Sequence, residues 1–200
     1  MKIRKVNFRC VGQAPLVFSK PICDSKADDE TNDQFEERTW IQRAHVDEQG
    51  RLFRPGSEIH RILCNAGAWL SMRIKGEGKK TYTKRLQSGI RVGGTGNFVV
   101  CNGGGKPATV KDVVPLRLFV PSDGKRGGGK RVWRTFPSIR TGWTVDAELL
   151  IVDEAITEDV FTKHIVTGGL YDGMGSMRVG TGGPNGQFAV QNIKFADIRL

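Results

Sequence analysis

Two clusters of basic residues are interleaved with aromatic residues and could bind a polyanion. The first cluster flanks Tyr82, and the second flanks Trp133 and Phe136. The cations of the two clusters are Lys79, Lys80, Lys84, Arg85, Lys125, Arg126, Lys130, Arg131, Arg134 and Arg140. Single-stranded nucleic acids are held by cations along the phosphate backbone and by aromatic rings that stack on unpaired bases. We therefore predict that these cations contact a polynucleotide, and that Trp133 either stacks on a base or anchors its segment to the core.

A glycine-rich segment near the end of the chain could approach such a ligand closely. The segment Gly168 to Gly186 contains eight glycines in nineteen positions, a composition that disfavours the interior of a helix or strand because glycine loses the most conformational freedom on folding. It runs from a predicted helix into a predicted strand and has no Lys-Ser/Thr pair, which argues against a P-loop or a dinucleotide fingerprint. We expect its main-chain N–H groups to contact phosphates, with Gly173, Gly175 and Arg178 as binding residues.

Residues for catalysis or metal binding are not grouped in the sequence. There is no Gly-x-Ser-x-Gly motif, and the four cysteines include no Cys-x-x-Cys pair. We predict no catalytic residues, no metal site and no cofactor, and we expect a binding protein rather than an enzyme. The alternative is a metal-dependent ribonuclease that gathers Mg²⁺ with a cluster of acidic side chains, although an acidic loop is more often simply solvated. The acidic residues in question are Asp24, Asp28, Asp29, Glu30 and Asp33.

The charge distribution favours an anionic partner. The 200 residues carry a formal charge of +10, but seven of the 21 acidic residues lie between Asp24 and Glu37. The rest of the chain has 30 basic and 14 acidic residues, a formal charge of +16. Such a field attracts polyanions, although positive charge also serves solubility.

No apolar run reaches the roughly 18 residues of a membrane span, and no apolar signal region follows Met1. We expect a cytoplasmic protein of a bacterium or a phage-infected cell, with no membrane partner.

The hydrophobic pattern predicts two β-α-β halves. Strands are indicated by apolar residues at every second position, and helices by apolar residues at i, i+3, i+4 and i+7. The expected elements are a strand at 2–11, a helix at 57–70, strands at 86–92 and 143–151, a helix at 157–167 and a strand at 187–195. Ser57 and Thr157 are placed to cap the two helices, and Gly168 is expected to end the second.

This order predicts an α+β protein with a ferredoxin-like or RRM-like antiparallel sheet and two helices on one face. We expect a single domain over residues 1–200. Two stretches fall outside the pattern, an acidic loop at about 19–47 and a Gly-, Lys- and Arg-rich insertion at about 93–142. The basic tracts of this insertion, Asn102 to Lys106 and Asp123 to Arg131, are expected to be mobile fingers.

Two segments carry a resemblance to a known family. Gln49 to Leu63 contains Pro55-Gly56-Ser57 followed by regularly spaced apolar residues, and the glycine-rich segment ends in Gly186-Gln187-Phe188. The first resembles the entry into the first helix of RAMP-superfamily proteins, the RNA-binding backbone subunits of CRISPR effector complexes, and the second resembles their Gly-rich loop. The segment from Arg134 to Trp143, which leads into the predicted strand at 143–151, is also similar to the corresponding segment of short phage- and prophage-encoded proteins that are RAMP-like.

The resemblance implies guide-type RNA held along the sheet and the Gly-rich loop, with copies of the protein stacked head to tail. RAMP subunits that cut target RNA use an Asp in the loop after the first strand, a place that Asp24, Asp28 or Asp29 could fill. Two hypotheses follow. The chain binds RNA or single-stranded DNA and self-assembles along it, or it is a phage-encoded structural or host-interaction protein that assembles through the same surfaces without nucleic acid.

Overall fold

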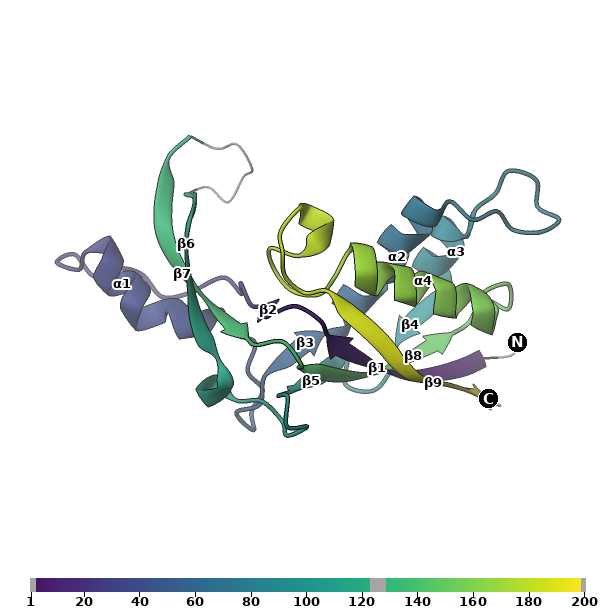
Figure 1. The fold of residues 1–200 in the computed structure, drawn as a ribbon, viewed down its shortest axis with the longest axis horizontal. Helices are drawn as coiled ribbons and strands as arrows, with labels where there is room; N and C mark the ends of the chain where they lie inside the picture. Colours follow the sequence, from purple (N-terminus) through teal and green to yellow (C-terminus); the bar gives the residue numbers. More distant parts are fainter. Residues whose placement is uncertain (1–2, 123–128, 199–200) are drawn as a thin grey trace.

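An antiparallel sheet forms the centre of the molecule, which the computed structural model describes for residues 3–122 and 129–198 (Figure 1). Its strands are β1 (Ile3–Gly12), β3 (Phe53–Pro55), β4 (Ile90–Val92), β5 (Asn97–Cys101), β8 (Thr144–Ile151) and β9 (Phe188–Ile198). β4 and β5 pair with opposite ends of the same side of β8, so together they act as one interrupted strand. The resulting order, β4/β5 beside β8, then β1, then β9, is that of a ferredoxin-like fold.

Helices α2 (Gly56–Leu70) and α4 (Glu158–Tyr171) cover one face of the sheet, with α3 (Tyr82–Gly89) beside them (Figure 1). The predicted apolar stripes face this interface, because Ile59, Ile62 and Leu63 of α2 are fully buried. Phe8 of β1 meets Phe161 of α4 edge to face, with ring centroids 5.7 Å apart. The α+β, ferredoxin-like architecture predicted from the sequence is therefore confirmed.

Two predicted helix boundaries were wrong. α2 begins at Gly56 with Pro55 as its N-cap, so Ser57 lies inside the helix. Thr157 does cap α4 by accepting the Val160 N–H, but the helix continues past Gly168 to Tyr171. A Cβ on Gly168 would lie 2.4 Å from Cγ2 of Ile62, so this glycine permits close packing of the two helices rather than ending α4.

The segment predicted as a strand at 86–92 is mostly helix. α3 ends at Gly89, and only Ile90–Val92 pair as β4. Leu86 is fully buried in the main core, and Tyr82 is 8% exposed. The apolar positions in this stretch fit a strand and a short helix equally well, and packing against α2 decides for the helix.

The acidic stretch at 19–47 is not entirely loop. It contains α1 (Asn32–Thr39), which runs into a 3-10 turn, Trp40–Arg43. Thr31 and Gln34 form a capping box at the start of α1, in which each side chain bonds the backbone of the other residue. α1 has few buried side chains, so the hydrophobic pattern did not indicate it.

The insertion at 93–142 contains regular structure around its two basic tracts. β5 belongs to the main sheet, and β6 (Val114–Pro121) and β7 (Arg131–Ile139) form a long hairpin that stands away from it (Figure 1). The short strand β2 (Leu16–Val17) pairs with β7 to complete a second sheet. The tract Asn102 to Lys106 is a turn in which Oδ1 of Asn102 accepts the N–H groups of Gly104 and Lys106. Most of the tract Asp123 to Arg131 lies outside the described residues.

The remaining helical turns are short. They span Val110–Asp112 and Val179–Thr181, and the second belongs to the Gly-rich segment. None of the helices in 3–122 and 129–198 combines the length and the apolarity that crossing a membrane requires.

Candidate nucleic-acid interface

A groove with a volume of about 1100 Å³ lies between the β6–β7 hairpin, the acidic segment with α1, and residues 173–186, which follow α4 and Asp172 and are called the Gly-rich loop below. In Figure 1, α1 and the Gly-rich loop lie on either side of the hairpin. The groove is lined from the hairpin by Arg131, Trp133, Arg134 and Phe136, from the acidic segment by Lys20, Asp24, Phe35, Glu36 and Arg43, and from the Gly-rich loop by Ser176, Met177, Thr181, Gly182 and Gly183, among others. Three segments that are far apart in the sequence therefore share one concave surface.

The hairpin wall presents an aromatic residue among cations. Trp133 is paired with Phe119 across the two strands, with ring centroids 5.2 Å apart, and it remains 51% exposed. The Arg117 guanidinium lies over the Trp133 ring, 5.4 Å from its centroid. This packing holds the indole in place and leaves half of it accessible. The hairpin can therefore offer both stacking surface and positive charge to a ligand.

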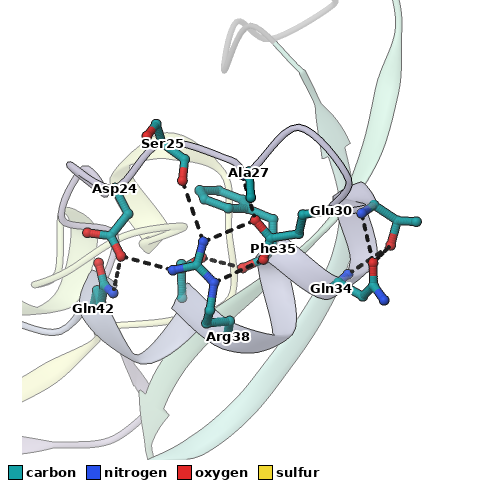
Figure 2. A network of polar contacts seen from close by, with 10 residues as sticks. Asp24, Ser25, Ala27, Glu30, Gln34, Phe35, Arg38 and Gln42 are labelled. Carbon is teal, nitrogen blue, oxygen red and sulfur yellow. Dashed lines mark hydrogen bonds and ion pairs between the residues drawn. The ribbon is translucent and has the colours of Figure 1, made fainter.

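The acidic wall is held together by Arg38, as Figure 2 shows. Arg38 donates from Nε to Oε1 of Glu30 at 2.9 Å and from Nη1 to Oδ2 of Asp24 at 3.2 Å, and its guanidinium lies over the Phe35 ring. Gln42 donates to the same Asp24 oxygen at 2.9 Å. The Arg38 bond holds the pKa of Glu30 below its usual value. Asp24 and Glu30 thus serve to fold the segment onto α1.

Arg43 lies at the base of this wall and is 6% exposed. It donates to both carboxylate oxygens of Glu36, at 2.7 and 2.9 Å, and lies over the ring of Phe136, 5.5 Å from its centroid. Burial lowers the pKa of Arg43, and the nearby positive charge of Arg134 lowers it further against the opposing effect of Glu36. Arg43 therefore joins α1 to the hairpin, a role that sequence reasoning missed.

Most main-chain N–H groups of the Gly-rich loop donate hydrogen bonds to other atoms of the protein. Within the described residues, the loop N–H groups that donate to protein oxygens are those of Gly173, Met174, Gly175, Ser176, Val179, Gly180, Thr181, Gly182, Gly183, Asn185 and Gly186. These groups are consequently not free to cradle a phosphate, contrary to the expectation from the sequence. The loop contributes to the groove as a preformed wall.

Glycine is required in this loop because the backbone folds tightly on itself. Gly173 and Gly175 adopt φ values of +76° and +84°, in the left-handed region that side chains disfavour. A Cβ on Gly175 would lie 2.6 Å from the Val17 carbonyl oxygen, and one on Gly186 would lie 1.8 Å from that of Met174. Gly173 and Gly175 are buried, so they shape the loop rather than face a ligand.

A buried ionic network attaches the loop to the start of α2. Glu58, whose carboxylate binds Arg54, also accepts the Gly175 N–H at 2.6 Å. Asp172 is 1% exposed and accepts from Arg61 of α2 and from Nε of Arg178, the latter at 2.9 Å. Although burial opposes ionisation, the adjacent Arg54 and Arg61 guanidinium groups and the Gly175 N–H hold the pKa of Glu58 below its usual value. Arg178 is thus placed beside the groove but is engaged by Asp172.

The predicted binding residues separate into two regions. Arg131, Trp133 and Arg134 line the groove, and Lys130 is exposed just before them. Arg140 is exposed in the turn after β7, away from the residues that line the groove. Lys125 and Arg126 lie outside the described residues.

The first cluster lies away from the hairpin, in and before α3 (Figure 1). Lys79 and Lys84 are exposed there, whereas Lys80 pairs with Glu77. Arg85 donates to Asp153 at 2.9 Å and to Glu77 at 2.5 Å. The buried Tyr82, like Phe136 in the hairpin, is not exposed for base stacking, so Trp133 is the accessible ring of the three in these clusters.

The open face of the main sheet carries a smaller hollow of about 520 Å³. Its charges are largely paired across the strands. Arg9 binds both oxygens of Asp146 at 2.7 Å, and Lys5 pairs with Glu148. The ring of Phe8 is turned into the core and is 3% exposed. This face therefore offers polar groups of mixed charge in place of stacking rings.

Metal-ligating side chains are scattered over the described part of the chain. Within it, no group of three or more His, Cys, Asp or Glu side chains is arranged to hold a metal ion. Asp24, considered above as a Mg²⁺ ligand, bonds Arg38 and Gln42. Cys10 is buried, and burial raises its thiol pKa, whereas Cys23 is exposed.

Two residues beside the groove were not predicted from the sequence. Met177 lines the groove, and its backbone is in the left-handed conformation. The one sequence signal that could have indicated it is a long apolar side chain within a glycine-rich segment. Asp172 was missed because its partners Arg61 and Arg178 lie 111 and 6 residues away. An acidic residue directly before such a loop gives no indication of which cation it binds.

No protein-family model matches this chain, and no curated protein matches it. Among solved structures, it is similar to a chain in the cryo-EM structure of the Type III-B Cmr-beta bound to cognate target RNA, with 9% identity and a TM-score of 0.50. That match covers 97% of this chain and 61% of the other, so this chain spans about three fifths of its length. The crystal structure of Cmr6 from Pyrococcus furiosus matches with 10% identity and a TM-score of 0.47, over 94% of this chain and 99% of that one. At 9% identity the likeness to the first of these structures concerns the fold alone.

Proposed function

We propose that this protein binds RNA or single-stranded DNA in the groove between the β6–β7 hairpin and the Gly-rich loop. The observation that carries the proposal is the meeting of Arg131, Trp133 and Arg134 with the Gly-rich loop on one concave surface. Cations neutralise phosphates, and an exposed indole stacks on bases of any sequence. The similar fold in the structure of Cmr-beta bound to cognate target RNA supports RNA as the first ligand to test.

The exposed indole of the hairpin favours one strand over two. Trp133 is 51% exposed and can stack only on a base that is accessible, whereas the bases of a duplex are already stacked on both faces. We therefore infer that an unpaired strand binds more tightly than a duplex of the same length.

The experiment is fluorescence anisotropy with labelled 20-nucleotide RNA, DNA and duplex probes at low salt. Wild-type protein is expected to bind the single strands, and its log affinity should fall linearly with log salt concentration. The variant Lys130→Gln/Arg131→Gln should weaken binding and flatten that slope by about 0.7 for each phosphate that it no longer neutralises. Absence of binding to every probe would refute the proposal.

The matched control removes the same charge from the first basic cluster. Lys79→Gln/Lys84→Gln changes two exposed residues that are not among those lining the groove. If the groove is the main site, this variant retains more affinity than the hairpin variant. An equal loss of affinity in both variants would extend the binding surface to α3, as the sequence predicts.

Self-assembly is a second proposal, favoured by an exposed apolar surface on the helices. Trp69 at the end of α2 and Tyr171 at the end of α4 meet edge to face, with ring centroids 6.5 Å apart, and are 48% and 58% exposed. Val166 and Leu170 of α4 are also exposed. Such residues are typical of protein contacts.

This surface would serve head-to-tail assembly along a strand, or assembly of a phage-encoded structural or host-interaction protein without nucleic acid. Light scattering of nuclease-treated protein with and without an added strand distinguishes the two. Assembly that needs the strand supports the first, and assembly without it supports the second. A monomer under both conditions refutes self-assembly. A cytoplasmic location in a bacterium or a phage-infected cell belongs to both proposals.

A further inference from the structure

Met177 has a backbone conformation that its side chain makes unfavourable. Its φ is +51°, in the left-handed region where glycine is the usual residue. The Gly-rich loop contains eight glycines between Gly168 and Gly186, yet this position carries a long apolar side chain. A glycine here would relieve the conformational cost, so the presence of methionine calls for a role of its side chain.

The surrounding structure holds Met177 in this conformation from several sides. Its carbonyl oxygen accepts the main-chain N–H of Asn185 at 3.2 Å and the side-chain Nδ2 of the same residue at 3.4 Å. A Cβ on Gly183 would lie 1.9 Å from that oxygen, so the two loop segments are in direct contact. On either side, the Ser176 N–H donates to the Val17 carbonyl and Arg178 is bound to Asp172. Strain that is fixed in this way is typical of functional positions.

The position of Met177 shows where its side chain can act. Met177 is half-buried and does not belong to the hydrophobic core, so its side chain is not required to fill a core space. It lines the same groove as Trp133, from the loop side instead of the hairpin side. A thioether is flexible and polarisable and packs favourably against aromatic rings.

We propose that Met177 packs against an unpaired nucleobase that enters the groove, while Trp133 supplies the stacking surface of the hairpin. This inference rests on the proposed function and makes it more specific, because it assigns the groove to bases as well as to phosphates. Bases in a duplex are stacked on both faces and cannot insert in this way. The ligand class is therefore a single strand with accessible bases.

The test compares Met177→Gly and Met177→Leu with the wild-type full-length protein. Because glycine tolerates the left-handed backbone, Met177→Gly should keep or raise the melting temperature. Its affinity for a 20-nucleotide single strand should fall about two- to tenfold, because glycine has no thioether to pack against a base. Met177→Leu keeps an apolar side chain and should retain most of the affinity.

An abasic oligonucleotide of the same length separates base contact from a structural role. The difference between wild type and Met177→Gly should disappear with this probe, because the bases are absent. The inference is wrong if wild type binds the normal strand and Met177→Gly binds it equally well, and it is also wrong if the variant loses affinity equally for the abasic strand. Wild-type protein that binds no single strand would instead refute the proposed function itself.

Discussion

The Glu58 carboxylate at the start of α2 accepts a hydrogen bond of 2.6 Å from the main-chain N–H of Gly175, which lies 117 residues later in the chain. The same carboxylate binds Arg54 at 2.7 Å and lies 3.7 Å from Arg61. The bond therefore connects the two segments that carry the family resemblance, the Pro55-Gly56-Ser57 entry and the Gly-rich loop. Through it, the position of the groove wall depends on a buried ion pair.

Replacing Glu58 by Ala should destabilise the protein by about 3–5 kcal/mol, because Arg54 would be left buried without its counter-charge. Chemical denaturation measures the free energy of unfolding directly. Asp146→Asn is the control, because its ion pair with Arg9 is exposed and is expected to contribute much less to stability. Similar losses of stability in the two variants would show that the buried network does not anchor the loop.

Gly186→Ala tests how tightly the Gly-rich loop packs. Gly186 has φ of +76°, and its added Cβ would collide with the Met174 carbonyl, so we expect a loss of about 2–4 kcal/mol. Gly78→Ala is matched in backbone, with φ of +63°, but has open space around the Cβ position. It should lose only about 1 kcal/mol. Thermal and denaturant unfolding of both variants measure the difference, and equal losses of stability would contradict the close packing.

Stability should fall as the solution is acidified from pH 7 towards pH 5, in part because of His164. This residue is fully buried; its Nδ1 donates to the Val160 carbonyl at 2.6 Å, and Nε2 has no partner within the described part of the chain. Burial, assisted by Lys163, lowers its pKa below the ordinary value of about 6.5, against the opposing Val160 bond. The unfolded chain therefore takes up a proton first, which favours unfolding as the pH falls through that value.

The variant His164→Leu should flatten this pH dependence, and the free energy of unfolding measured by denaturant at several pH values tests it. His45 also has a lowered pKa, mainly through burial, so His45→Gln should flatten the profile independently. An unchanged profile in His164→Leu would show that the buried imidazole does not couple folding to protons.

The central fold could be predicted because its elements carry strong periodic patterns. Val6, Phe8 and Cys10 alternate along β1, and the apolar stripe of α2 repeats at helical spacing, so both elements were predicted, although the cap of α2 was not. α1 was missed because it depends on a capping box at Thr31 and on ion pairs of Arg38, and these contacts leave no hydrophobic signal. Gly168 was misinterpreted because its partner across the helix interface, Ile62, lies more than a hundred residues away.

The candidate site could be predicted only in part. The proposed binding residues of the hairpin could be predicted, because cations that lie close to Trp133 in the sequence can be recognised without the structure. Conversely, the engagement of Arg178 by Asp172 and the left-handed backbone of Met177 depend on how the loop folds onto α2. Residue type alone therefore suggested a free cation and a phosphate-binding backbone, whereas tertiary structure produces a preformed wall.

Trp133→Ala tests whether the hairpin stacks on bases. Loss of one base–aromatic stack costs about 1–3 kcal/mol, or roughly 5- to 150-fold in affinity for a single strand. Because half of the ring is exposed, the melting temperature should change little. Trp69→Ala removes a similarly exposed tryptophan from the helical face. It should leave unchanged the affinity for a strand too short to hold two copies, because the proposed assembly contact of Trp69 acts only between copies. Anisotropy with one labelled strand measures both variants, and equal affinities would place the strand elsewhere, because the exposed indole of Trp133 is the stacking surface that the groove requires.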